Sequence, residues 1–331
     1  MTELRTVPTG SAAVTGEDIV AARTRIGDAV VRTPLLSAPW ATGDLWLKAE
    51  SLQTIGAFKI RGAVNAIRRL VPEQRARGVI THSSGNHGQA VSWAARAAGI
   101  PAVIVMPENA AEVKIVATRA LGAEVVFAPG DGREAVAGAI QRERGLVMIP
   151  PYDAPDVISG QGTLALEVLE DLESVDSVLA PVGGGGLISG VGVAVRHLSP
   201  ATRVVGVESE LAADARDSLA AGRRVTWDPR DVARTIADGT RAPVLGRLTF
   251  PLIQSTVSEI VTVSETEILA AMSLLARRSR LVVEPSGALA VAAFLRDPNR
   301  FGRTVAILSG GNVEPDILAD ALTSLPGRTF S

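Results

Sequence analysis

The sequence predicts an α/β protein with two lobes of parallel sheet, and three observations support this fold class. Short runs rich in valine, isoleucine and leucine alternate with longer amphipathic stretches from about residue 45 onward. The alternation forms two successive series, and glycine- or serine-rich turns join several runs to the helical stretch that follows. The 331 residues, 47% of them hydrophobic, are enough for a large core and two lobes.

The first series predicts a small lobe. Its apolar runs are expected to form buried strands at 78–82, 102–106, 124–127 and 146–149. Apolar residues between them have helical spacing at 86–98, 109–121 and 131–144. Because strands and helices alternate, the sheet should be parallel, with ligands at the carboxyl ends of its strands.

The second series predicts a larger lobe. Strands are expected at 177–181, 203–207, 259–263 and 304–308, and helices at 155–171, 186–198, 265–279 and 284–296. We therefore expect a large domain of residues 1–75 and 150–331, a small domain of residues 76–149, and an active site between them.

Composition narrows the class of function. The net charge of -2 gives no reason to expect nucleic acid or an anionic membrane as partner. No apolar run reaches the roughly 18 residues of a membrane span, and the first residues lack the apolar core of a signal peptide. The absence of cysteine excludes thiol nucleophiles and favours a cytoplasmic, soluble protein.

Lys59 is the first candidate for chemistry. Gly56 marks a turn, and the apolar spacing after it places Lys59 in the first turn of a helix. The helix N-terminus carries partial positive charge, so that charge and nearby Arg61 should lower the lysine pKa and favour the neutral amine that forms imines. The alternative is a surface lysine extending from a helix end.

Two further turns are suited to anions. Ser83, Ser84, Asn86 and His87 surround a glycine between a strand and a helix, which suits a carboxylate, although an ordinary capped turn would look similar. The four glycines at 183–186 also join a strand to a helix, where backbone amides can surround a phosphate; the alternative is a flexible turn.

These segments together resemble the fold-type II pyridoxal-phosphate enzymes, which share the fold of the tryptophan synthase β subunit. The resemblance is to the serine/threonine dehydratase and serine racemase family and covers residues 17–320. It is carried by the ordered motifs GAFKIRGA, SSGNHGQA, PYDAPDVISGQGT, PVGGGGLISG, TIADG and LSGGNV.

The resemblance implies roles for the candidate residues. Lys59 would hold pyridoxal 5'-phosphate and move the α-proton of the substrate. The other cofactor contacts would be Phe58, Asn86, Gly183, Gly184, Gly185, Gly186, Gly239 and Ser309. The substrate carboxylate would be bound by Ser83, Ser84, Asn86 and His87.

The resemblance also implies a divalent cation. Glu208, the Ala212 carbonyl and Asp214 are similar to the loop that holds Mg²⁺, Mn²⁺ or Ca²⁺ in the racemase-like branch of the family. Carboxylates and a carbonyl are suitable ligands for such ions. A solvated acidic helix start is the alternative.

We expect an ammonia-lyase that converts an L-hydroxy-amino acid of the threonine or serine type to a 2-oxo acid and ammonia by β-elimination. Ser84, on the cofactor face opposite Lys59, leaves a serine or aspartate racemase with dehydratase side activity open. A 3-hydroxyaspartate dehydratase is also open, with Arg133 as a candidate for the second carboxylate. A β-replacement enzyme and a non-catalytic binding protein are the remaining alternatives, and a homodimer is the habit of the family.

Overall fold

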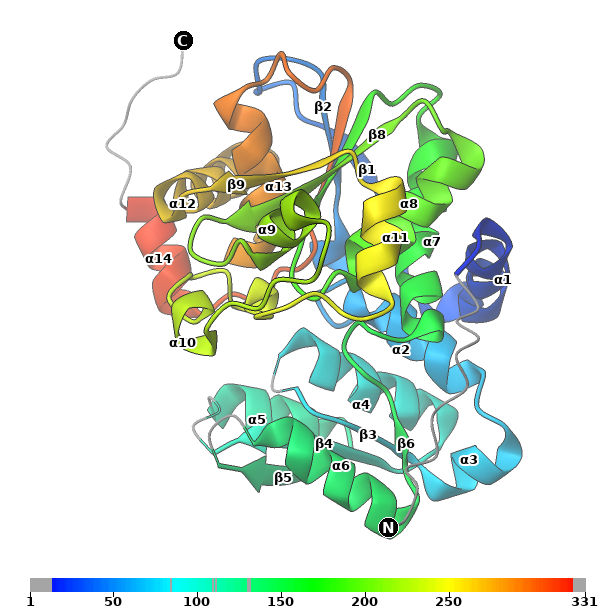
Figure 1. The fold of residues 1–331 in the computed structure, drawn as a ribbon. Coiled ribbons are helices and arrows are strands. Elements are labelled where there is room, and N and C mark those ends of the chain that lie inside the picture. Colours follow the sequence, from blue (N-terminus) through cyan, green and yellow to red (C-terminus); the bar gives the residue numbers. More distant parts are fainter. Residues whose placement is uncertain (1–13, 84, 109, 111, 130–131, 324–331) are drawn as a thin grey trace.

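Two sheets organise the computed structural model, which describes residues 14–83, 85–108, 110, 112–129 and 132–323. Each sheet forms its own lobe, and the two lobes lie one above the other in Figure 1. The predicted α/β class with parallel-sheet lobes is confirmed. None of the described helices is long and apolar enough to cross a membrane.

The upper lobe contains a six-stranded sheet in the order β1-β2-β10-β7-β8-β9. Its strands are β1 (Leu35–Ser37), β2 (Leu45–Lys48), β7 (Ser177–Pro181), β8 (Arg203–Ser209), β9 (Glu259–Val263) and β10 (Thr304–Ile307). All neighbours are parallel except the edge pair β1 and β2. Strands β7 and β10 are buried along their whole length, which explains why they are apolar runs without alternation.

Helices cover both faces of this sheet. Val178 and Ala180 of β7 pack in one core with the first group of helices, and Leu179 packs in the core of the second group. The first group is α1 (Gly16–Ile26), α7 (Pro155–Asp171), α8 (Gly186–Leu198) and α11 (Thr249–Thr256). The second group is α12 (Glu265–Leu274), α13 (Pro285–Arg296) and α14 (Pro315–Thr323), and α9 (Asp214–Ala221) and α10 (Pro229–Val232) lie in the connections.

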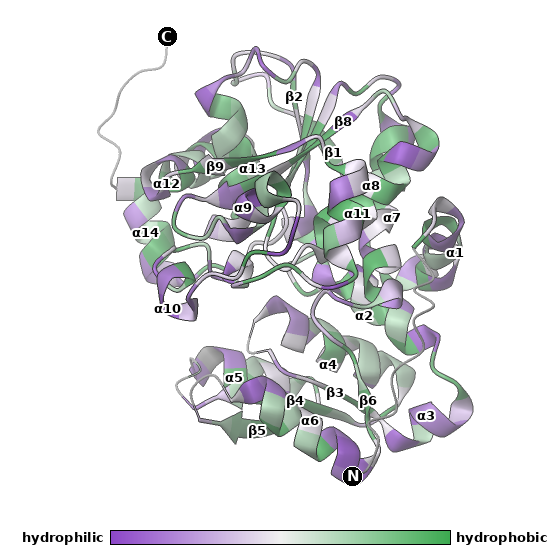
Figure 2. Cartoon of the chain, viewed as in Figure 1, coloured by the Kyte–Doolittle hydropathy of each residue, from purple (hydrophilic) through white to green (hydrophobic). Residues whose placement is uncertain are grey.

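The lower lobe contains a four-stranded parallel sheet in the order β5-β4-β3-β6. Its elements are β3 (Val79–Thr81), α4 (Asn86–Ala98), β4 (Ala102–Pro107), α5 (Glu112–Ala120), β5 (Glu124–Ala128), α6 (Arg133–Arg144) and β6 (Val147–Met148). The short helix α3 (Pro72–Arg77) leads into it. Figure 2 shows the outer surface of α3 largely in the hydrophilic colour and most of the sheet strands in the hydrophobic one.

The lobes share one apolar core. Helix α2 (Lys59–Arg68) contributes Ile60 and Ala63, and α4 of the lower lobe contributes Ala90 and Val91 to the same cluster. The lobes are therefore joined by packed side chains as well as by the chain itself. The domain boundaries at residues 76 and 150 stay a prediction.

The predicted elements have the right type, with small differences at their ends. Helices 86–98, 155–171 and 186–198 have the predicted bounds. The expected helix 265–279 is α12 followed by a π-helical turn (Leu275–Ser279), which ends at Arg280 with φ 62°. Strands β1 and β2 and the short helices α3, α9, α10 and α11 were not predicted.

Candidate active site

Lys59 is the first residue of α2, as predicted. Its side chain is partly buried, and its Nζ donates a hydrogen bond of 2.6 Å to the carbonyl of Pro151. Burial lowers the lysine pKa from 10.5 to about 8, and the negative charge of Glu284 acts in the opposite direction. The lowered pKa was expected, but the expected contribution from Arg61 is wrong.

Arg61 belongs to a cluster of buried ion pairs at the start of α2. Its guanidinium donates to Glu50 at 2.8 Å and to Glu167 at 2.6 Å, and Lys48 donates to Glu167 at 2.6 Å. All four side chains are buried, with two positive and two negative charges. The cluster ties the start of α2 to β2 and α7, so it fixes the position of the lysine two residues earlier.

The loop after β3 brings Asn86 to the upper lobe. Asn86 Nδ2 donates to Glu284 Oε1 at 2.8 Å, and its Oδ1 accepts from Asn312 at 2.8 Å. Ser83 Oγ accepts from the N–H of Gly85 at 3.3 Å within the loop. Ser84 lies outside the described residues. The predicted substrate loop is thus anchored to the upper lobe by its asparagine.

His87 is buried and is held in one protonation state. Its Nε2 lies 2.9 Å from the Ile149 carbonyl, which only accepts, so Nε2 is the protonated nitrogen. Burial lowers its pKa to about 3, and Nδ1 has no partner among the described residues. The imidazole is therefore neutral and has no remaining N–H for a carboxylate, so any contact from His87 to that group must come from its backbone.

The four glycines form a turn into which no side chain fits. Gly185 has φ +92° and precedes α8, which begins at Gly186. A Cβ at Gly184 would overlap the ring of Tyr152, and one at Gly183 would lie 3.0 Å from Thr240 Cα. Tyr152 follows Pro151, whose carbonyl holds Lys59, so one short segment links the lysine to the glycine turn.

The last predicted loop closes the same region. The carbonyl of Ser309 accepts from the N–H of Phe58 at 3.0 Å, and the Phe58 ring centroid lies 5.1 Å from Lys59 Nζ. The N–H of Gly239 donates to Ser286 Oγ at 2.9 Å. Phe58 and Ser309 are thus next to Lys59, and Gly239 lies beside the start of α13.

Sequence reasoning missed Glu284 at the centre of this region. The carboxylate is 4% exposed, and burial together with the charge of Asp238 raises its pKa to about 7. A Cβ at Gly310 would lie 2.5 Å from Glu284 Oε1. The available signal was a glutamate directly before Pro285 at a helix start, but that signal is also typical of an ordinary first helical turn.

The predicted cation ligands lie together after β8. Glu208 accepts from the N–H groups of Ala215 at 3.1 Å and Arg216 at 2.8 Å. Both Asp214 oxygens are buried without a hydrogen-bond partner in the described part of the chain. Ala212, two positions earlier, is also buried. Burial raises the pKa of Asp214 to about 7 and, with Asp214, that of Glu208 as well.

Two buried carboxylates, of which Asp214 has both oxygens without a hydrogen-bond partner among the described residues, fit a cation, because an uncompensated buried charge is costly. Within the described residues no group of three His, Cys, Asp or Glu side chains could hold a metal. A cation here would therefore need a backbone carbonyl or water as well, as the predicted set with Ala212 implies.

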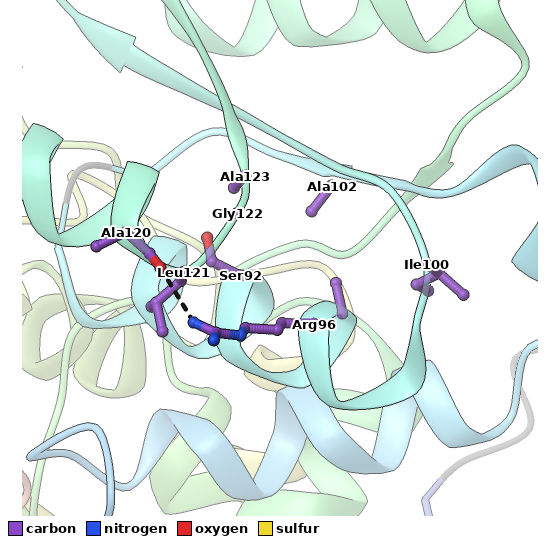
Figure 3. A pocket seen from close by; sticks show the side chains of 9 residues that line it. Ser92, Arg96, Ile100, Ala102, Ala120, Leu121, Gly122 and Ala123 are labelled. Atoms are coloured by element: carbon purple, nitrogen blue, oxygen red, sulfur yellow. Dashed lines mark hydrogen bonds between the residues drawn. The ribbon is translucent and has the colours of Figure 1, made fainter.

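Two other features belong to the lower lobe. Arg133 begins α6 in the lower lobe, and its charge, after burial and Glu134, contributes to the pKa of His82. A cavity of about 340 Å³ between the ends of α4 and α5 is lined by Arg96, Ser92 and mostly apolar residues (Figure 3). None of the predicted site residues lines this cavity.

The chain is similar to known proteins over most of its length. A family profile described as "Pyridoxal-phosphate dependent enzyme" matches residues 26–310. An L-threo-3-hydroxyaspartate ammonia-lyase of Saccharomyces cerevisiae is 42% identical over 90% of this chain and 93% of its own. A serine racemase of Schizosaccharomyces pombe is 40% identical over 93% of this chain and 97% of its own. A solved structure of maize serine racemase superposes with TM-score 0.89 at 39% identity and covers 94% of this chain and 98% of that chain.

Proposed function

Because this chain belongs to the pyridoxal-phosphate-dependent enzymes, we propose that it is an ammonia-lyase acting on an L-hydroxy-amino acid of the threonine or serine type. The reaction is β-elimination, which yields a 2-oxo acid and ammonia. The observation that carries the proposal is the position of the Lys59 amine. Its pKa is about 8, and it bonds the carbonyl of Pro151, which directly precedes the tyrosine that lies against the glycine turn. Relatives that are ammonia-lyases support the same reaction class.

The residues around Lys59 fit pyridoxal phosphate. Glycines 183–186 place backbone without side chains at the N-terminus of α8, where backbone N–H groups and the helix dipole favour a phosphate. Asn86 and Ser309 would contact the ring, with Phe58 beside it. When bound, the cofactor supplies the electron sink for cleavage at the α-carbon.

Lys59 is the proposed base. A pKa of about 8 in place of 10.5 gives far more neutral amine near neutral pH, and only the neutral amine can take a proton. Glu284 keeps the pKa from falling further, because its negative charge stabilises the ammonium form. Lys59 can therefore accept the α-proton.

The substrate carboxylate would be bound by the loop at the start of α4. Ser83, Ser84 and Asn86 provide side-chain groups, and His87 provides a backbone N–H at the positive end of the helix. Asn86 is held by Glu284 and Asn312, so the loop position is set before substrate arrives. This preorganisation favours one orientation of the α-carbon relative to Lys59.

A racemase of serine or aspartate is the second candidate, supported by relatives that are serine racemases. It requires a proton donor on the face opposite Lys59, and we propose Ser84 for that role. If Ser84→Ala left exchange of the α-proton of a D-amino acid unchanged, this two-base mechanism would be wrong. A 3-hydroxyaspartate dehydratase, with Arg133 at the second carboxylate, is a third candidate supported by the relative from Saccharomyces cerevisiae.

We also propose Mg²⁺, Mn²⁺ or Ca²⁺ at Glu208, Ala212 and Asp214. The two unused Asp214 oxygens support this site. The ion would neutralise two buried carboxylates and stabilise the segment between β8 and α9. The absence of cysteine supports a cytoplasmic location, and a homodimer follows the family resemblance.

Two measurements test the proposed function. The visible absorbance of the purified protein with pyridoxal phosphate should disappear in Lys59→Ala. A panel of L- and D-hydroxy-amino acids, scored for 2-oxo acid and for enantiomer with and without Mg²⁺, then separates the lyase from the racemase. Absorbance without product from any member of the panel would leave a cofactor-binding protein and reject the lyase.

A further inference from the structure

Lysine is rare in this chain, and each lysine has a specific contact. Only three of the 33 basic residues are lysines, so arginine provides most of the surface cations. The ammonium of Lys48 pairs with Glu167, and that of Lys59 bonds the Pro151 carbonyl. The third, Lys114, belongs to α5 of the lower lobe and contacts acids of the upper lobe.

Lys114 bridges the lobes through two different loops. Its Nζ lies 3.2 Å from Glu314 Oε1 and 3.6 Å from Asp238 Oδ2. The lysine side chain is 22% exposed, whereas the acids are 40% and 48% exposed. Burial lowers the pKa of Lys114, but the two acids outweigh this effect and raise the pKa above its usual value, so Lys114 remains a cation at neutral pH. The arrangement is one partly buried cation between two carboxylates from separate segments.

Both acids stand beside residues of the candidate site. Asp238 precedes Gly239, whose N–H bonds Ser286, and begins the short 3-10 helix η3 (Asp238–Thr240). Glu314 follows Asn312 by two positions, and Asn312 donates to Asn86. The contacts of Lys114 therefore restrain the loop that carries Gly239 and the loop that carries Asn312.

The two lobes meet differently on their two sides. The contact of α2 with α4 is apolar and belongs to a continuous buried core. Figure 1 shows α2 toward the right of the view and α5 on the left, below α10 and α14. At α5, Lys114 pairs with Asp238 and Glu314, and such partly exposed ion pairs can separate in water at much lower cost than a core. The α2–α4 side therefore resembles a hinge, and the Lys114 side is where the lobes would separate.

We propose that Lys114 is a positioning residue that holds the lower lobe, with its substrate loop, closed on the cofactor-binding loops of the upper lobe. The proposal rests on the proposed function, because it assigns the closed state to the form that binds the amino acid. Lys114 does not touch the reacting atoms. It acts by fixing the position of Asn86 and the start of α4 relative to the loops at 238–240 and 309–312.

The test compares three variants of the full-length protein. Lys114→Met removes the charge, and Lys114→Arg keeps it. Arg144→Met is the matched control, since Arg144 pairs with Glu124 at 2.8 Å and both partners belong to the lower lobe. Hydrogen–deuterium exchange of segments 83–90, 236–242 and 308–314 is followed with and without pyridoxal phosphate, together with KM and kcat for the best hydroxy-amino acid.

In Lys114→Met, we expect faster exchange in all three segments and a KM about three- to tenfold higher, with unchanged cofactor absorbance and a smaller change in kcat. Lys114→Arg should restore wild-type exchange, and Arg144→Met should match the wild type throughout. The proposal is overturned if Lys114→Met exchanges like the wild type, or if Lys114→Arg behaves like Lys114→Met. If the wild type shows neither cofactor absorbance nor turnover, the proposed function fails, and exchange in the cofactor-free protein still decides the role of Lys114.

Discussion

The side-chain amide of Asn86 donates a hydrogen bond of 2.8 Å to Glu284, a residue 198 positions further along the chain. This bond joins the predicted substrate loop of the lower lobe to a buried carboxylate of the upper lobe. The same carboxylate is the charged group that raises the pKa of Lys59 against the effect of burial. Glu284 thus connects loop position with the proton affinity of the candidate base.

Glu284→Gln should lower the pKa of Lys59. The amide keeps a partner for Asn86 but removes the negative charge that favours the ammonium form, so deprotonation moves from about 8 to lower pH. The measurement is the pH dependence of acetylation of Lys59 in the cofactor-free protein, followed by peptide mass spectrometry. Glu124→Gln, on the outer strand β5, is the control with no expected change. A midpoint that stays the same or rises in Glu284→Gln contradicts this coupling.

Arg61→Met should strongly destabilise the fold. It leaves the buried carboxylates of Glu50 and Glu167 with only Lys48 as a cation, and breaking such a buried cluster costs about 3–5 kcal/mol. The measurement is the free energy of unfolding in urea. Arg144→Met, which breaks an exposed pair, should cost much less than Arg61→Met. Equal losses of unfolding free energy in the two variants would show that the buried cluster stabilises the fold no more than an exposed ion pair does.

Gly184→Ala should impair binding of pyridoxal phosphate. The new methyl group would overlap the Tyr152 ring and displace either the ring or the glycine turn. We expect the Kd for the cofactor to rise by roughly tenfold or more, which corresponds to ~1.4 kcal/mol. Gly138→Ala is the control, because its methyl group would approach only the end of the Arg142 side chain, at 3.5 Å.

A second variant checks the cause of that effect. Replacing Tyr152 by alanine in the Gly184→Ala background removes the ring that the methyl group meets. Part of the lost affinity should then return. If the double variant binds no better than Gly184→Ala, steric overlap with Tyr152 is not the reason for the loss.

Asp214→Asn should abolish stabilisation by divalent cations. The substitution replaces a carboxylate with two unpaired oxygens by a neutral amide, so the proposed site loses a charged ligand. Mg²⁺ or Ca²⁺ should therefore raise the melting temperature of the wild type but not of the variant. Glu210→Gln, on the same segment but exposed, should respond like the wild type. Identical cation responses in the wild type and Asp214→Asn would place the ion elsewhere.

Much of the fold follows from local signals in the sequence. Helix α7 begins with Pro155 at a position where proline is favoured, and β7 is an uninterrupted apolar run, so both have the predicted bounds. Strand β2 was missed because it has only four residues and the last of them is Lys48. That lysine is buried only because Glu167, 119 residues away, pairs with it. A short-range pattern carries no information about such a partner.

The candidate site shows the same limit. Glycine turns and the Lys59 helix are local features, and the sequence locates them. The role of Glu284 depends on burial by segments far apart in the sequence, and the interlobe contact of Lys114 depends on acids 124 and 200 positions away. The expectation that Arg61 acts on Lys59 was wrong for this reason, since distant carboxylates already neutralise it.

Tyr152, which lies against the glycine turn, is the only tyrosine of the chain. Burial raises its pKa above 10.0, so the phenol should ionise at higher pH in the folded protein than in the unfolded one. Ultraviolet titration in alkaline solution therefore follows one identified hydroxyl, without overlap from any other phenol. The molecule thus contains its own optical reporter of whether the glycine turn at 183–186 is intact.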